Sequence, residues 1–212
     1  MAEYVSKNEV RPYRTQFHNV FNEVHKECKK QGLTFSSPLL VGSAKRNLVV
    51  RHHNKGFDCD YQIFLQKNKN NMSAKEIKLL LIKLFDKYMP DDYENCEDST
   101  SAITIKKKSS TKKSSIEFSY DVAIMRERKK YDTPEIIRRS ENNYCWNFLS
   151  DMEDFGYHYG LISGQEMWND LRERYYDKII NERQKNESVR RKSFQLLHEA
   201  TNETLDCFEI EP

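Results

Sequence analysis

Three aspartates stand within predicted β-strands, where carboxylates are not expected. Asp58 and Asp60 lie one residue apart in the run FDCDYQIFL, and Asp121 lies in the later run SIEFSYDVAIM. Because successive side chains of a strand point to opposite faces, Asp58 and Asp60 should project from the same side. Like charges held close together resist burial unless they are paired or bind a cation. The spacing therefore predicts a cation site.

The strand around Asp121 offers two candidates for a third acid. Its apolar residues share one face, and the opposite face carries Glu117, Ser119 and Asp121. Carboxylates are disfavoured in strands, and departures from local propensity concentrate at functional sites. Either Glu117 or Asp121 could therefore complete the set begun by Asp58 and Asp60.

The elements that must position these acids follow from periodicity and turn residues. Residues 38–41 are predicted as a short strand that enters a tight turn at Gly42. Apolar residues at helical spacing predict a helix over 13–31, and Ser73 with Glu76 forms a capping box that opens a second helix. Strands are predicted over 57–65, 101–105 and 115–125, with the lysine-rich segment 106–114 as the loop of a hairpin.

The remainder of the chain changes character after about residue 150. Residues 136–140 and 144–148 fit either a hairpin or a helix that starts near Thr133. Ser163 and Glu166 form a second capping box ahead of a helix, and a last helix is predicted over about 188–201. The sequence therefore predicts an α/β (α+β) unit over residues 1–150, with a mixed sheet flanked by helices, followed by a helical unit over 151–212.

Composition limits the classes of protein to consider. Of 212 residues, 32% are charged, and 35 Lys and Arg against 33 Asp and Glu leave a charge of +2, so net charge indicates no class of partner. The apolar runs are too short to span a bilayer, and the N-terminus lacks the apolar segment of a signal peptide. Five scattered cysteines without a Cys-x-x-Cys motif fit a reducing cytoplasm and provide no zinc site. The oligomeric state is not indicated.

The order of these motifs resembles that of the DNA polymerase β-like nucleotidyltransferase superfamily. That pattern comprises a Gly-Ser turn after a first strand, here Gly42-Ser43, then an Asp-x-Asp strand, here Asp58 and Asp60, and a third acid on a later strand. The resemblance covers roughly residues 38–125 and the preceding helix. Asp121 is preferred to Glu117 because its Tyr-Asp-Val setting matches the family. The segment between Ser43 and Asp58 is longer than usual.

The resemblance implies a set of ligands and roles. Asp58, Asp60 and Asp121 would be catalytic ligands of two Mg²⁺ ions, for which Mn²⁺ can substitute, and Asp121 would hold the ion that activates the acceptor hydroxyl. Gly42 and Ser43 would contact the triphosphate of an NTP such as ATP, with Lys45 and Arg46 adding positive charge. The implied activity is transfer of a nucleoside monophosphate from the NTP to a hydroxyl of a nucleotide, RNA, protein or small molecule. The alternative is a non-catalytic nucleotide- or RNA-binding module with the same fold.

Other candidates have simpler interpretations. The lysines of the predicted loop could hold a nucleic-acid acceptor, although such runs are usually only solvated; they are Lys106, Lys107, Lys108, Lys112 and Lys113. His52 and His53 could contact phosphate or metal but fit an exposed polar loop better. Tyr144 and Trp146 could stack on a base, and core packing is the simpler role.

Overall fold

The computed structural model describes residues 2–52, 56–108, 116–128, 131–149, 153–185 and 193–210. The chain forms two compact units. One is Tyr4–Leu149, and the other comprises residues 150–212 together with residues 1–3. The first unit contains a mixed sheet with helices, and the second contains helices α4, α5 and α6.

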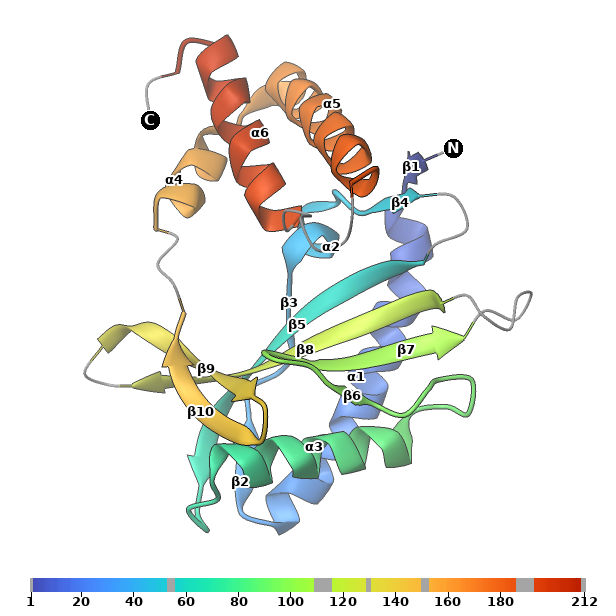
Figure 1. Ribbon diagram of the computed structural model, residues 1–212, viewed down its shortest axis with the longest axis vertical. Coiled ribbons are helices and arrows are strands. Elements are labelled where there is room, and N and C mark those ends of the chain that lie inside the picture. The colour runs from blue at the N-terminus through green and yellow to red at the C-terminus, as the bar shows by residue number, and fades with distance from the viewer. Residues whose placement is uncertain are drawn as a thin grey trace. The chain divides into compact units, whose positions relative to one another are not determined.

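The larger unit is organised around a mixed sheet of eight strands within the described residues (Figure 1). Five strands form its main path in the order β10-β9-β8-β5-β2, and β3, β7 and β6 extend it. The central pair, β5 and β8, is parallel, whereas the neighbouring pairs are antiparallel. The strand bounds are β2 Leu33–Phe35, β3 Leu39–Val41, β5 Phe57–Asn68, β6 Glu97–Asp98, β7 Ile103–Lys108, β8 Ile116–Arg128, β9 Tyr131–Ser140 and β10 Asn143–Phe148, with the short strands β1 Ala2–Tyr4 and β4 Val50–His52 outside this sheet.

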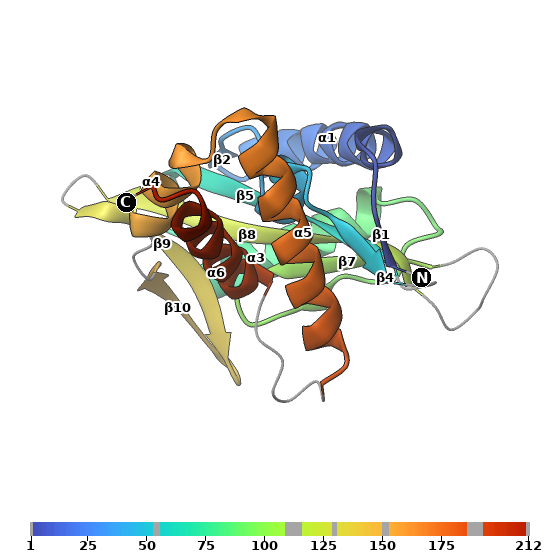
Figure 2. The ribbon, with the colours of Figure 1, turned by 90° about the horizontal axis from the view of Figure 1, so that it is seen from above.

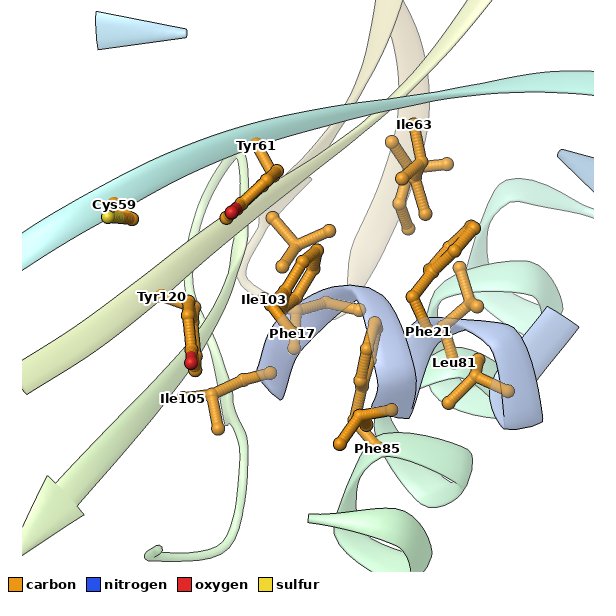
Figure 3. Close-up of a cluster of buried hydrophobic side chains, with 14 of the residues drawn as sticks. Phe17, Phe21, Cys59, Tyr61, Ile63, Leu81, Phe85, Ile103, Ile105 and Tyr120 are labelled. Atoms are coloured by element: carbon orange, nitrogen blue, oxygen red, sulfur yellow. The ribbon is translucent and has the colours of Figure 1, made fainter. Parts of the chain in front are cut away.

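Two helices, α1 (Lys7–Lys30) and α3 (Ala74–Tyr88), pack on one face of this sheet. Figure 3 shows Phe17 of α1 facing Tyr61 of β5 and Tyr120 of β8, with Phe85 of α3 beside it and Phe21 of α1 directed toward Ile63 of β5. Phe17 stacks on Tyr61 with ring centroids 4.1 Å apart. The apolar face of each central strand is therefore buried against the helices, which turns the alternate residues, including the aspartates, to the opposite face.

Both helices begin at capping boxes. Ser73 and Glu76 exchange the predicted hydrogen bonds ahead of α3. The predicted start of α1 at residue 13 is wrong, because Ser6 and Glu9 form an equivalent box and the helix begins at Lys7. Pro12 lies inside α1, where it donates no backbone N–H to the helix.

Several strand predictions need correction. The lysine-rich segment is partly strand, because β7 continues to Lys108 and pairs with β8 as far as Ile116. Residues 109–115, which include Lys112 and Lys113, lie outside the described residues. The hairpin interpretation of residues 136–148 is confirmed by the antiparallel β9–β10 pair, whose turn contains Glu141 at φ +54°. Its strand β9 begins earlier than predicted.

The smaller unit contains three helices in its described residues, α4 (Glu153–Leu161), α5 (Gly164–Arg183) and α6 (Ser193–Cys207). Helices α5 and α6 lie side by side, as Figure 2 shows, and both bury apolar residues such as Leu171 and Leu197. The predicted capping box at Ser163 does not form, since its hydroxyl contacts Met167 Sδ instead of a backbone N–H. In the part of the chain that the structure covers, no helix combines the length and apolar character that a membrane span requires.

Candidate active site

The three predicted aspartates converge on the face of the sheet opposite α1 and α3. One carboxylate oxygen from each of Asp58, Asp60 and Asp121 lies within 4.8 Å of the others. Strand pairing explains the arrangement, because β5 and β8 run parallel with Asp60 directly beside Asp121 and Asp58 two residues earlier on the same face. The β5–β8 pairing thus brings Asp121 beside Asp58 and Asp60, which lie far from it in the sequence, and the three form one acidic cluster.

Burial and mutual repulsion strongly perturb this cluster. Burial, and then the negative charges of Asp58 and Asp121, raise the pKa of Asp60 to about 7 from its ordinary value of 3.8. Burial also raises the pKa of Asp121, against the opposing effects of a hydrogen bond from Thr104 and the nearby Lys106. Near neutral pH, the protein groups around the cluster therefore compensate the negative charge of its carboxylates poorly.

A divalent cation fits this donor set. Mg²⁺ and similar hard cations prefer oxygen ligands, commonly one or two carboxylates together with phosphates and water. Bringing a positive charge between Asp58, Asp60 and Asp121 would relieve the repulsion that raises the pKa of Asp60. The acidic cluster is therefore consistent with a divalent-metal site.

The Gly-Ser motif lies directly against this cluster. Val41 of β3 pairs with Asp60 of β5, and the chain then turns at Gly42 into the five-residue helix α2 (Gly42–Arg46) instead of the predicted simple turn. Gly42 adopts φ +65°, and a Cβ atom on it would lie 2.0 Å from Asp60 Oδ2. Only glycine permits this approach, both because of its backbone conformation and because no side-chain atom intervenes.

Replacing Gly42 with alanine should disturb the site and the fold. Backbone strain at positive φ should lower the free energy of unfolding by about 1–2 kcal/mol, and the clash should displace the Asp60 carboxylate. Urea denaturation with and without Mn²⁺ measures both effects, and we expect the variant to lose most of any stabilisation by the metal. The matched control is Gly160→Ala, where an added Cβ meets no atom within 4 Å. Equal behaviour of the two variants would contradict this role of Gly42.

The other predicted phosphate-binding residues occupy α2. Arg46 donates from Nη1 to the Gly42 carbonyl at 3.2 Å, a contact that closes the short helix on itself. Lys45 is exposed and lines a cavity of about 580 Å³ beside α1, together with Arg11 and Arg14. Ser43 accepts a hydrogen bond from Leu48 through its backbone carbonyl. The roles of Ser43, Lys45 and Arg46 in nucleotide binding stay predictions.

Glu117, the alternative third acid, is engaged elsewhere. The Tyr13 hydroxyl donates to Glu117 Oε1 at 2.8 Å, and Lys107 Nζ lies 3.5 Å from the same oxygen. Among the described residues, Glu117 does not belong to the cluster of acids that includes Asp121. Geometry therefore favours Asp121 as the third acid.

Lys106 and Lys107 of β7 do not form a single basic surface. Lys106 pairs with Glu97 at 2.5 Å. Its neighbour Lys107 projects from the other face of the strand, toward Tyr13 and Glu117. Alternation along β7 thus separates the two charges, and both already have acidic partners.

The two aromatic candidates make packing contacts in the larger unit. Tyr144 and Trp146 are partly buried against the core, with the Tyr144 hydroxyl donating to Asp98 and the Arg126 guanidinium 4.4 Å from the Trp146 ring centroid. These contacts agree with a packing role. His52 ends β4, and His53 lies outside the described residues.

Sequence reasoning missed one residue in contact with the cluster, Thr104 of β7. Its hydroxyl donates to Asp121 Oδ1 at 2.5 Å. A threonine between two isoleucines is an ordinary strand residue, so no local signal distinguishes it. Only the β7–β8 register brings it beside Asp121.

Comparison with families and curated proteins by sequence gives no match. No family model matches the chain, and no curated protein is significantly similar to it. Relationships are therefore visible only in the fold.

Solved nucleotidyltransferase structures share this fold. The GTP-bound form of DncV from Vibrio cholerae matches with a TM-score of 0.61 and 16% identity over 93% of this chain and 66% of DncV. Another DncV structure, described as a cyclic AMP-GMP synthase and prokaryotic cGAS homolog, matches at TM-score 0.52 and 13% identity over 80% of this chain and 58% of DncV. The CD-NTase CdnG from Bradyrhizobium diazoefficiens, in complex with GTP, matches at 0.52 and 12% over 73% of this chain and 42% of CdnG.

These matches confirm the fold predicted from the Gly-Ser and aspartate motifs. DncV and CdnG are cGAS-like members of the DNA polymerase β-like nucleotidyltransferase superfamily, and this protein has their α+β fold. The chain spans about six-tenths of the length of the DncV structures. At such low identity, the comparisons establish the fold and leave the activity to be argued from the site.

Proposed function

We propose that this protein is a Mg²⁺-dependent nucleotidyltransferase that moves a nucleoside monophosphate from an NTP to the hydroxyl of a second nucleotide. One observation carries the proposal: Asp58, Asp60 and Asp121 converge within 4.8 Å beside a glycine turn that only glycine can make. An intact acidic cluster costs folding stability through repulsion, and a module that only bound nucleotide would have no need of all three acids.

Each residue has a distinct part in this reaction. Asp58 and Asp60 would hold two Mg²⁺ ions, replaceable by Mn²⁺, and Asp121 would share the ion nearer the acceptor. When bound, these ions would neutralise the triphosphate and activate the attacking hydroxyl. Gly42 and Ser43 would hold the phosphates through backbone N–H groups and the Ser43 hydroxyl, with Lys45 and Arg46 adding positive charge nearby.

The transfer forms one bond at the α-phosphorus and breaks another. The acceptor oxygen attacks the α-phosphorus, a new phosphodiester bond forms, and the bond to the β-phosphate oxygen breaks to release pyrophosphate. The hydroxyl releases its proton to solvent in this step, so the products are the phosphodiester, pyrophosphate and one proton. The three aspartates act by positioning charge, because phosphoryl transfer depends mainly on orientation and electrostatic stabilisation.

Relatives with this fold support a nucleotide as the acceptor. DncV is described as a cyclic AMP-GMP synthase, and one of its structures contains the linear intermediate pppA(3′,5′)pG. Other DncV structures hold GTP or 3′-deoxy ATP. We therefore propose residues 1–150 as the catalytic domain, residues 151–212 as its helical partner, and a linear or cyclic oligonucleotide as product.

Product analysis tests the proposal directly. The protein is incubated with each labelled NTP, singly and in pairs, with Mg²⁺ or Mn²⁺, and the products are identified by mass. We expect pyrophosphate and an oligonucleotide from the wild type and neither from an Asp58→Asn, Asp60→Asn double variant. A product that instead joins the nucleotide to protein or RNA would change the acceptor class. NTP binding without pyrophosphate, with every acceptor offered, would favour the non-catalytic module.

A further inference from the structure

We propose, on the basis of the function inferred above, that Thr104 is a positioning residue that fixes the Asp121 carboxylate for its part in nucleotidyl transfer. Its hydroxyl donates to Asp121 Oδ1 at 2.5 Å. This hydrogen bond restricts rotation of the carboxylate, and because a carboxylate has several acceptor sites, the group could still ligate a cation. Outer-shell partners of this kind set the orientation and basicity of metal ligands.

The sheet places Thr104 in line with the acids. Thr104 of β7 pairs with Asp121 of β8, and Asp121 pairs in turn with Asp60 of β5. These three side chains therefore form one row across the same face of the sheet. The contact is a consequence of the β7–β8 register, and a shift of one residue would turn Thr104 to the other face.

A second hydroxyl supports Thr104 from behind. Ser99 Oγ lies 2.9 Å from Thr104 Oγ1. Since the single proton of Thr104 is directed to Asp121, Ser99 is the donor in this second contact. The hydroxyl chain Ser99–Thr104–Asp121 thus has one consistent direction, and each donor ends on an acceptor.

The far end of this chain is anchored in the core. Lys78 of α3, whose side chain is only 1% exposed, donates to the Ser99 carbonyl at 2.5 Å and lies 2.7 Å from Asp98 Oδ1. Breaking a buried ion pair of this kind is strongly unfavourable, because one charge would be left without its partner. The position of Ser99, and through it that of Thr104, is therefore tied to a helix that packs in the hydrophobic core.

A neutral donor suits this position better than a charged one. A lysine or arginine bonded to Asp121 would fix the carboxylate but would also compete with the cation for its charge. The hydroxyl of Thr104 orients the same oxygen without supplying a full positive charge. Its contribution should therefore appear in the chemical step and in metal dependence, and much less in NTP binding.

The test compares Thr104→Val, which keeps the shape and removes the hydroxyl, with Thr104→Ser, which retains it. We expect Thr104→Val to lower kcat, or to raise the metal concentration for half-maximal rate, by about 10–100-fold, with KM for NTP changed less than about threefold. Thr104→Ser should recover most of the loss. Thr34→Val, a half-buried threonine of the same sheet that pairs with Lys67, is the matched control. A Thr104→Val variant with wild-type rate and metal dependence would overturn the proposal.

A binding readout separates this inference from the proposed activity. The rise in Tm on adding Mn²⁺ is measured for the same variants, and it should be smaller in Thr104→Val than in the wild type and in Thr34→Val. If the wild type releases no pyrophosphate, the activity is wrong, and the Mn²⁺ response alone decides the role of Thr104. If the wild type shows no Mn²⁺ response either, both proposals fail. Should Thr104→Val not fold, Ser99→Ala removes the supporting donor and is expected to show the same effects more weakly.

Discussion

Asp121→Asn should abolish nucleotidyl transfer while leaving in place much of the affinity for the NTP and for the ion that Asp58 and Asp60 would hold with it. Asparagine keeps the shape of the side chain but removes the charge that would hold the ion beside the acceptor hydroxyl. That interaction matters chiefly in the transition state, so its loss should lower kcat by about 1,000-fold or more, which corresponds to about 4 kcal/mol. Pyrophosphate release gives the rate, and calorimetric titration with a non-hydrolysable NTP and Mg²⁺ gives the affinity.

Two further variants are compared with Asp121→Asn, one as a contrast and one as a control. Ser43→Ala should show the opposite pattern, with weaker NTP binding and a smaller effect on the chemical step, because the proposed contact to phosphate exists in both ground and transition states. Glu117→Gln is the matched acid control, since Glu117 lies on the same strand but bonds to Tyr13. It should retain its turnover. Full turnover in Asp121→Asn would show that Asp121 is not the third acid.

Short-range patterns are sufficient to predict which face of the sheet carries the three aspartates and where the chain turns at Gly42. Alternation around Asp58 and Asp60 gave the face on which both lie, and the same rule gave the face of Asp121. The turn at Gly42 followed from the end of an apolar run. Local patterns of this kind depend on strand periodicity and backbone conformation, which the chain encodes within a few residues.

Contacts set by strand pairing could not be predicted in the same way. Thr104 meets Asp121 because of the β7–β8 register, and nothing in the residues around Thr104 indicates that register. The same pairing extends β7 through Lys106 and Lys107, which propensity alone had assigned to a loop. Long-range pairing thus overrides local preference in both cases.

The capping signals at helix starts predict the structure at some positions and not at others, because packing as well as local sequence decides where a helix begins. The box at Ser73 formed as predicted, whereas the one at Ser163 did not. Apolar spacing alone predicts a start of α1 near residue 13, whereas the capping box of Ser6 and Glu9 begins the helix at Lys7. A capping motif indicates where a helix can begin, and packing of residues such as Val10 decides whether it does.

The partly buried carboxylate of Asp60 should make the metal-free protein less stable as the pH rises. The folded-state pKa of Asp60 is about 7 and its ordinary value is 3.8. Between these values, the folded state keeps a proton that the unfolded state releases, so stability is present at low pH and is lost as the pH rises toward and through 7. From pH 5 to pH 8, this effect should lower the free energy of unfolding by about 2–3 kcal/mol, or Tm by about 5–10 °C.

Asp60→Asn separates this effect from all other titrating groups. Without metal, the variant should melt at a higher temperature than the wild type at pH 8 and should depend less on pH, because residue 60 no longer ionises beside Asp58 and Asp121. With Mg²⁺ and NTP the order should reverse, since the wild type gains a ligand for the cation and the variant does not. Asp91→Asn, at an exposed acid in the loop after α3, is the control and should follow the wild type throughout. Equal pH dependence of wild type and Asp60→Asn without metal would mean that the cluster is hydrated enough to ionise freely, and the case for a cation held by all three aspartates would then lose its electrostatic basis.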